Sequence, residues 1–115
     1  MLSGVVVKAQ SYNVTGVWNT PFGGTVQFFQ KGKNVQFIYI NANYAHYANY
    51  SYTTDTRYEG TLTRVNRASG CTTYINVVGV VESNNSISEF WQGKDSNCDL
   101  TPTFSTNVKM NSRVN

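Results

Sequence analysis

The chain has 115 residues, of which 13% are charged, and a formal net charge of +3 at pH 7. This length allows one domain with one hydrophobic core, and the charged fraction is about half that of an average globular protein. Because lysines and arginines are scattered singly and no long apolar stretch occurs, we expect neither a nucleic-acid partner nor a membrane span.

The first part of the chain predicts strands joined by tight turns. We expect residues 1–11 to form an N-terminal arm or a first strand, and residues 12–115 to form the single domain. One strand is expected around residues 15–20, and the proline and glycines at 21–24 predict a turn. Apolar and polar residues then alternate on both sides of a second turn at 31–34, which indicates a β-hairpin.

The rest of the chain continues this pattern of short strands and local turns. Further strands are expected at residues 47–53, 58–65, 72–81, 87–92 and 104–110. The sequence therefore predicts an all-β fold, an antiparallel up-and-down β-barrel of about eight strands, with a two-sheet β-sandwich as the alternative. We favour the barrel because a meander closes without long crossing connections, and closure removes the edge strands.

The segment VTGVWNTPFGGT, residues 14–25, carries a family resemblance. It resembles the first strand and turn of avidin-like and lipocalin-like (calycin) small barrels, in which the tryptophan of a G-x-W motif, here Trp18, fills the barrel floor. Avidin-like proteins hydrogen-bond biotin through an asparagine and a serine, and the matching positions here hold Thr20 and Gly24. The resemblance thus implies a barrel with a pocket at one mouth, and it does not extend to biotin.

Two cysteines, Cys71 and Cys98, stand at the ends of a segment that contains a full hairpin. They can form a disulfide or remain as two buried free thiols. Sequons at Asn13, Asn49 and Asn84 are compatible with secretion, so we expect an extracellular or periplasmic protein. Two cysteines and one histidine without CxxC or HxxxH spacing do not make a zinc shell, and we expect no metal and no cofactor.

The main functional signal is a repeat of tyrosines. Tyr44, Tyr47 and Tyr50 recur every three residues, a spacing that suits an extended polyproline-like or irregular segment with all three on one side. Tyrosine suits sugars, aromatic ligands and protein partners, although such rings can also cover a barrel end or pair across strands. The ligand-binding residues that we expect are Tyr39, Tyr44, Tyr47, Tyr50, Tyr52 and Trp91.

The titratable residues do not predict catalysis. A general base such as His46 needs an orienting carboxylate and a reacting partner, and no spacing in the chain selects either. We expect Glu59 and Glu89 on the outer faces of strands, where cross-strand pairing with Arg64 or Lys33 accounts for them. Trp18 and Trp91 are both expected in the core, with Trp91 the nearer to a barrel mouth, and no catalytic residue is expected.

Taken together, these patterns predict a secreted, non-enzymatic module that binds a small molecule or glycan at a tyrosine-rich barrel mouth. The alternative is a protein-interaction module, such as a protease inhibitor, that uses the N-terminal arm or a strand edge. An enzyme that depends on His46 ranks third. Phe28 and Phe29 are adjacent and must point to opposite faces of a strand, so we also expect self-association to cover one of them.

Overall fold

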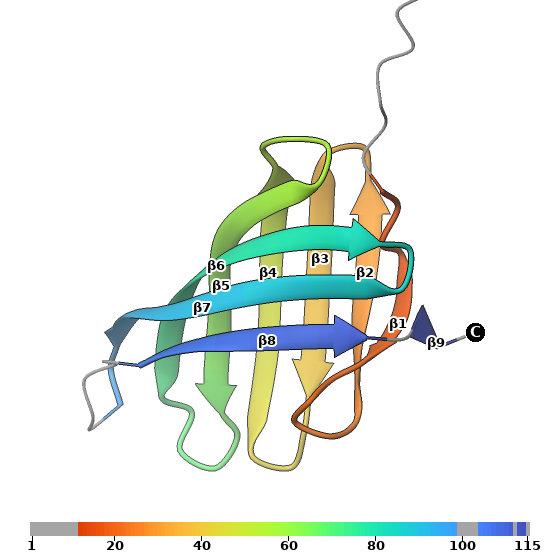
Figure 1. The fold of residues 1–115 in the computed structure, drawn as a ribbon. Helices are drawn as coiled ribbons and strands as arrows, with labels where there is room; N and C mark the ends of the chain where they lie inside the picture. The colour runs from red at the N-terminus through yellow and green to blue at the C-terminus, as the bar shows by residue number, and fades with distance from the viewer. Residues whose placement is uncertain (1–11, 99–103, 112, 115) are drawn as a thin grey trace, which may run out of the picture.

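The computed structural model describes residues 12–98, 104–111 and 113–114, and within these ranges every regular element is a β-strand (Figure 1). Residues 1–11, expected as an arm or first strand, lie outside the described residues. The strands are β1 (Gly16–Asn19), β2 (Thr25–Lys31), β3 (Asn34–Ile40), β4 (Tyr44–Tyr52), β5 (Arg57–Asn66), β6 (Thr72–Ser83), β7 (Ser86–Ser96), β8 (Ser105–Asn111) and β9 (Arg113–Val114).

The sheet is an antiparallel meander with the strand order β8-β7-β6-β5-β4-β3-β2-β1-β9. Strand β8 ends at Asn111 and β9 begins at Arg113, so the C-terminal segment pairs with β7 on one side and with β1 on the other. This brings the two ends of the meander together. The sheet curls until β6, β7 and β8 cross over β2 to β5 (Figure 1), and the predicted all-β barrel architecture is confirmed.

The strands form where apolar and polar residues alternate. In β3 the side chains of Val35, Phe37 and Tyr39 are buried, and the residues between them are exposed. The same alternation separates the neighbouring phenylalanines of β2, because Phe28 is buried and Phe29 is exposed. Self-association over the exposed ring stays a prediction.

The tyrosine repeat lies in β4, and the expected irregular segment is therefore wrong. This strand pairs along its length with β3 and β5, which imposes a period of two on its side chains. Tyr50 points into the barrel and is buried, whereas Tyr47 points outward and is 53% exposed. The three repeated tyrosines consequently do not share one side.

Small residues inside the barrel make room for large rings. A side chain at Gly79 would overlap the ring of Tyr58, and a Cβ at Gly60 would lie 2.8 Å from the ring of Tyr50. These two tyrosine rings stack on each other with their centroids 5.1 Å apart. The middle of the barrel is therefore filled by aromatic side chains and is not an open channel.

Trp18 is fully buried, as expected for the core. Its indole Nε1 donates a hydrogen bond of 2.9 Å to the carbonyl of Val14, and the guanidinium of Arg113 lies 4.8 Å from the centre of its ring. Because Arg113 belongs to β9, this contact holds the C-terminal segment against β1 at the point where the sheet closes.

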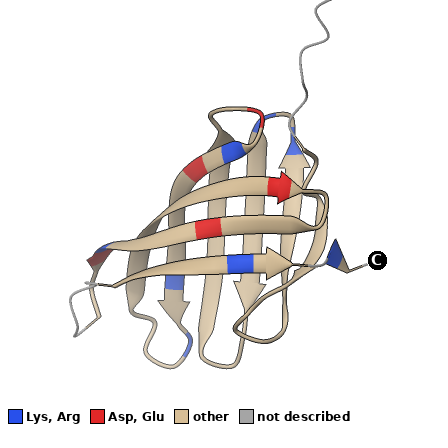
Figure 2. Cartoon of the chain, viewed as in Figure 1, with Lys and Arg blue, Asp and Glu red and all other residues tan. Residues whose placement is uncertain are grey.

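Within the described ranges the charged residues are spread singly over the strands and turns, without a patch of one sign in the view of Figure 2. The two ion pairs of the described residues are both exposed: Arg57 to Glu59 at 3.2 Å and Lys109 to Glu82 at 3.5 Å. Glu59 therefore pairs within its own strand and not with Arg64 or Lys33 as expected. Pairs this exposed contribute little to stability.

Candidate functional site

One end of the barrel contains the connections that follow β1, β3 and β5, together with the described residues on either side of 99–103 between β7 and β8. Cys71 and Cys98 form a disulfide here, which joins the β5–β6 turn to the residues after β7 and decides between the two alternatives that the sequence left open. The two cysteines are 27 residues apart, a loop length for which a disulfide contributes about 3 kcal/mol. We call this end the disulfide mouth.

Four inward side chains form a row across the disulfide mouth. Tyr39, His46, Arg64 and Thr73 lie opposite one another on β3, β4, β5 and β6. Neighbouring strands are about 4.8 Å apart, so the row is continuous. The rings of Tyr39 and His46 stack with their centroids 5.1 Å apart.

Further rings extend this row into an aromatic cluster. The ring of Trp91, from β7, lies 6.0 Å from that of His46 and 5.8 Å from that of Phe22 in the β1–β2 turn. Tyr44, at the start of β4, lies 5.9 Å from His46. Trp91 is buried as expected, whereas Phe22 is 52% exposed at the rim. We define the mouth cluster as Phe22, Tyr39, Tyr44, His46, Trp91 and Phe104.

Arg64 brings a positive charge into the mouth cluster. Its guanidinium carbon lies 5.0 Å from the ring centre of Tyr44 and 5.2 Å from that of Phe104. Its Nε is buried and has no hydrogen-bond partner. In the described ranges no carboxylate lies within ion-pair distance of Arg64, so its charge is not balanced by a neighbouring side chain.

His46 is a neutral hydrogen-bonding group in this environment. Its Nδ1 lies 3.0 Å from the carbonyl oxygen of Tyr39, which places the ring proton on Nδ1 and leaves Nε2 as an acceptor. Burial lowers the pKa of His46, and the positive charge of Arg64 lowers it further. Since no described carboxylate orients the ring, the arrangement lacks the parts of a catalytic dyad.

Glu89 lies below the mouth cluster, fully buried. Its Oε1 accepts a hydrogen bond of 2.8 Å from the indole Nε1 of Trp91, and its Oε2 accepts one from the hydroxyl of Tyr58. Burial raises the pKa of Glu89 to about 7, although both hydrogen bonds act in the opposite direction. The expected outward position of Glu89 is wrong because it alternates in phase with Ile87 and Trp91, whose side chains are both buried.

A hollow of about 490 Å³ adjoins the mouth cluster between the β1–β2 and β3–β4 turns. The hydroxyl of Tyr39 donates a hydrogen bond of 2.9 Å to the carbonyl of Gly23 and so links the two sides. The hollow falls in the size range of small-molecule sites. It is lined by Phe22, Gly23, Gly24, Tyr39, Ile40, Asn41, Ala42 and Asn43.

The structure separates the six residues expected to bind the ligand. Tyr39, Tyr44 and Trp91 come together in the mouth cluster. Tyr47 lies on the outer surface, whereas Tyr50 and Tyr52 are buried deeper in the barrel. The hydroxyl of Tyr52 donates to the carbonyl of Tyr12, away from the mouth, at 2.9 Å.

Sequence reasoning missed four side chains of this site: Phe22, His46, Arg64 and Phe104. Arg64 had a readable signal, because it alternates in phase with Tyr58 and Leu62, which are both fully buried. Phe22 and Phe104 lie outside the alternating strands, so their place depends on how the turns fold against the mouth.

Comparisons of the chain with protein-family models, with curated proteins and with solved structures gave no match. Across the described segments, no three His, Cys, Asp or Glu side chains gather in a group that could hold a metal ion. The same part of the chain contains no helix that could cross a membrane. The geometry of the disulfide mouth is therefore the basis for assigning a function.

Proposed function

We propose that the protein is a secreted, non-enzymatic binding module of the calycin-like type, which holds a small ring-bearing molecule or a glycan at the disulfide mouth. The observation that carries this proposal is the cluster of six rings at the disulfide mouth, of which the rings of Tyr44 and Phe104 pack directly on Arg64. Rings alone can serve to cover a barrel end, but a cation among them that no described carboxylate balances favours a site that binds a ligand through both stacking and hydrogen bonds.

The mouth offers both apolar contact and hydrogen bonds to a ligand. Phe22 and Tyr44 present ring surface that is not fully covered, and flat ligands gain by stacking on such rings. Hydrogen bonds to the Nε2 of His46 and to the side-chain amides of Asn41 and Asn43 at the hollow would fix the orientation of the ligand. The rings are rigid and lose little entropy when a ligand is bound.

A non-enzymatic role fits the chemistry of the buried groups. The carboxylate of Glu89 already accepts hydrogen bonds from Tyr58 and Trp91 on its two oxygens. His46 faces aromatic rings and a cation, and not an acid that could orient it. Among the described residues, His46 thus has no orienting acid and both oxygens of Glu89 are engaged, which favours binding over general acid–base catalysis.

The disulfide supports the secreted part of the proposal. Disulfides form and persist in oxidising compartments and are rare in the reducing cytosol. The bond between Cys71 and Cys98 lies at the proposed site itself, where it would hold two of the connections in place around a ligand.

A thermal-shift screen of small molecules, combined with a glycan array, tests the proposal. A ligand at 100 times its dissociation constant adds about 2.7 kcal/mol to the stability, which gives a clear shift. Hits should also change the fluorescence of Trp91, read in a Trp18→Phe variant in which Trp91 is the only remaining tryptophan. No hit in either screen, or hits that leave Trp91 unaffected, would contradict the proposal.

The same hits separate this function from the protein-interaction alternative. The residues that we assign to the disulfide mouth all lie at positions 20–104 of the chain, and residues 1–11, the expected N-terminal arm, lie outside the described residues. A chain that lacks residues 1–11 should therefore bind a hit with unchanged affinity, whereas an inhibitor that works through its arm would lose its target.

A further inference from the structure

Arg64 keeps its hydrogen-bonding capacity free for a ligand. Tyr44 and Phe104 contact the guanidinium through their rings, and such cation–π contacts do not use its N–H donors. These donors lie in the plane of the guanidinium in a fixed fork. Among the described residues none accepts a hydrogen bond from Arg64, and its buried Nε is without a partner. A buried donor left unpaired is unfavourable, and a ligand that accepts a hydrogen bond from it would remove this cost.

In the part of the chain that the structure describes, no anion near Arg64 balances its charge. Its neighbours in the row are the neutral His46 and Thr73, and the Oγ1 of Thr73 is within 2.9 Å of the Oγ of Ser96. On the rim, Arg67 adds a second cation, whose guanidinium donates to the carbonyl of Asn41 at 2.7 Å.

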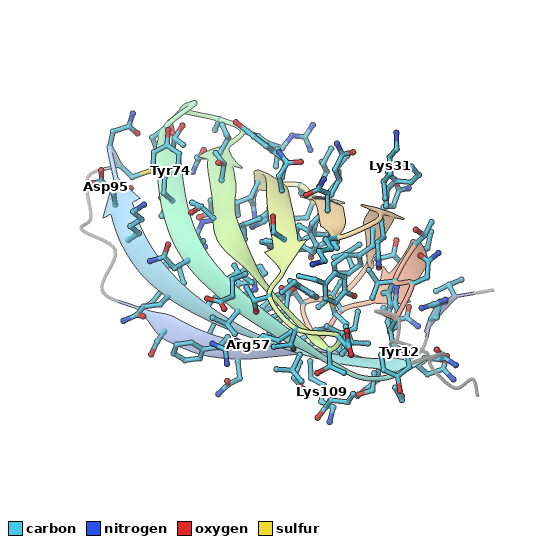
Figure 3. The ribbon with its side chains drawn as sticks, turned by 90° about the horizontal axis from the view of Figure 1, so that it is seen from above. Tyr12, Lys31, Arg57, Tyr74, Asp95 and Lys109 are labelled. Atoms are coloured by element: carbon cyan, nitrogen blue, oxygen red, sulfur yellow. A yellow bond between two sulfur atoms is a disulfide. The ribbon has the colours of Figure 1, made fainter. Side chains whose placement is uncertain are left out.

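The described carboxylates all lie elsewhere. Asp95 is the nearest along the rim, but it faces the exposed Tyr74 on the outer surface, where Figure 3 labels both residues. Glu89 is buried below the cluster and is held by Tyr58 and Trp91. The other three are in strands or turns of the opposite end of the barrel: Asp55, Glu59 and Glu82.

We infer that Arg64 binds an anionic group of the ligand, and that the ligand is a small ring-bearing carboxylic acid. This inference rests on the proposed function and specifies its ligand class. The guanidinium fork matches a carboxylate with two parallel hydrogen bonds. His46 lies one strand away from Arg64 and Tyr39 lies two strands away, about 5 and 10 Å, so the ring of such an acid would reach the mouth cluster while its carboxylate contacts Arg64.

Paired probes, each an acid and a neutral analogue of similar size and shape, test the inference. The full chain is titrated by calorimetry with phenylacetate and phenylacetamide, and with glucuronate and glucose. Each acid should bind about tenfold or more tightly than its neutral partner, because a charge-assisted pair is stronger than a neutral hydrogen bond. The pair with the higher affinity distinguishes an aromatic acid from a sugar acid.

Substitutions of Arg64 assign the effect to this side chain. In Arg64→Gln the preference for the acid should fall to about onefold, and in Arg64→Lys, which keeps the charge but not the fork, it should be intermediate. Arg57→Gln is the control, because Arg57 is an exposed arginine of the same strand that pairs with Glu59. Circular dichroism confirms that each variant folds.

A salt titration of the unmodified chain is a second measurement that does not need a variant. Added salt should weaken binding of the acid and leave binding of its neutral partner unchanged. Equal affinity for acid and neutral probes would overturn the inference while leaving the proposed function in place. An acid preference that persists in Arg64→Gln would also overturn it, and failure of all four probes to bind would contradict both proposals.

Discussion

The hydroxyl of Tyr58 donates a hydrogen bond to the Oε2 of Glu89 at the centre of the barrel, where both side chains are fully buried. Gly79 permits this contact because it leaves room for the Tyr58 ring. The second oxygen of Glu89 holds the indole of Trp91, whose ring belongs to the mouth cluster. A buried carboxyl group is thus connected directly to the proposed binding site.

The first prediction concerns pH. The pKa of Glu89 rises from 4.5 to about 7 on folding, so the folded state binds the proton more tightly than the unfolded state. Stability from this group is full below about pH 4.5 and is lost as the pH rises to about 7, an interval worth about 3 kcal/mol. Urea denaturation at several pH values should show this decline, and Glu89→Gln should remove it.

The titration of His46 changes stability with pH in the opposite direction, so the pH experiment needs a control for it. Because its pKa is lowered below 6.5, its contribution to stability is present at high pH and is lost as the pH falls. The difference between the unmodified chain and Glu89→Gln isolates the Glu89 effect from this one. An identical pH profile for the two proteins would show that Glu89 is not a buried carboxyl group of raised pKa.

The second prediction compares two stacked tyrosines. Tyr58→Phe removes a donor from a buried carboxyl group and should lower the unfolding free energy by about 1–3 kcal/mol. Tyr50→Phe removes a buried hydroxyl that has no hydrogen-bond partner, so it should be neutral or stabilising. Chemical denaturation measures both, and a larger loss in Tyr50→Phe than in Tyr58→Phe would disagree with this interior.

The third prediction concerns the disulfide. Replacing Cys71 and Cys98 together by serine should lower stability by about 3 kcal/mol, since the unfolded chain regains the freedom of the closed loop. Because the bond joins two connections of the disulfide mouth, ligand affinity should fall as well. The serine variant is measured at a temperature where it remains folded, so that the two effects are read separately. Unchanged affinity there would show that the mouth does not depend on this bond.

Much of the fold could be predicted from the sequence, because strand formation here follows local alternation. The pattern of Val35, Phe37 and Tyr39 is enough to indicate β3, and the hairpin between the cysteines made a disulfide possible without deciding it. The short β9 could not be predicted, since two residues carry no pattern and pair only once the barrel has closed on β1.

The candidate site was harder to predict, because its members come from distant strands. The three-residue spacing of Tyr44, Tyr47 and Tyr50 suggested one shared side, but ladder pairing with both neighbours sets a period of two. Arg64 and Glu89 were expected outside because charged residues are seldom buried. Both alternate along their strands with buried residues, and this places their side chains inside the barrel. There, another polar side chain or a ligand has to provide their hydrogen-bond partners.

The most direct test of the disulfide mouth as a binding site compares two tyrosines of one strand. Tyr44 points into the mouth cluster and Tyr47 points outward, three residues further along β4. Tyr44→Ser and Tyr47→Ser are titrated by calorimetry with the probe that the unmodified chain binds best. We predict that Tyr44→Ser weakens binding about tenfold, as expected for loss of one stacked ring, and that Tyr47→Ser binds like the unmodified chain. Full affinity in Tyr44→Ser, or a loss confined to Tyr47→Ser, would contradict the account.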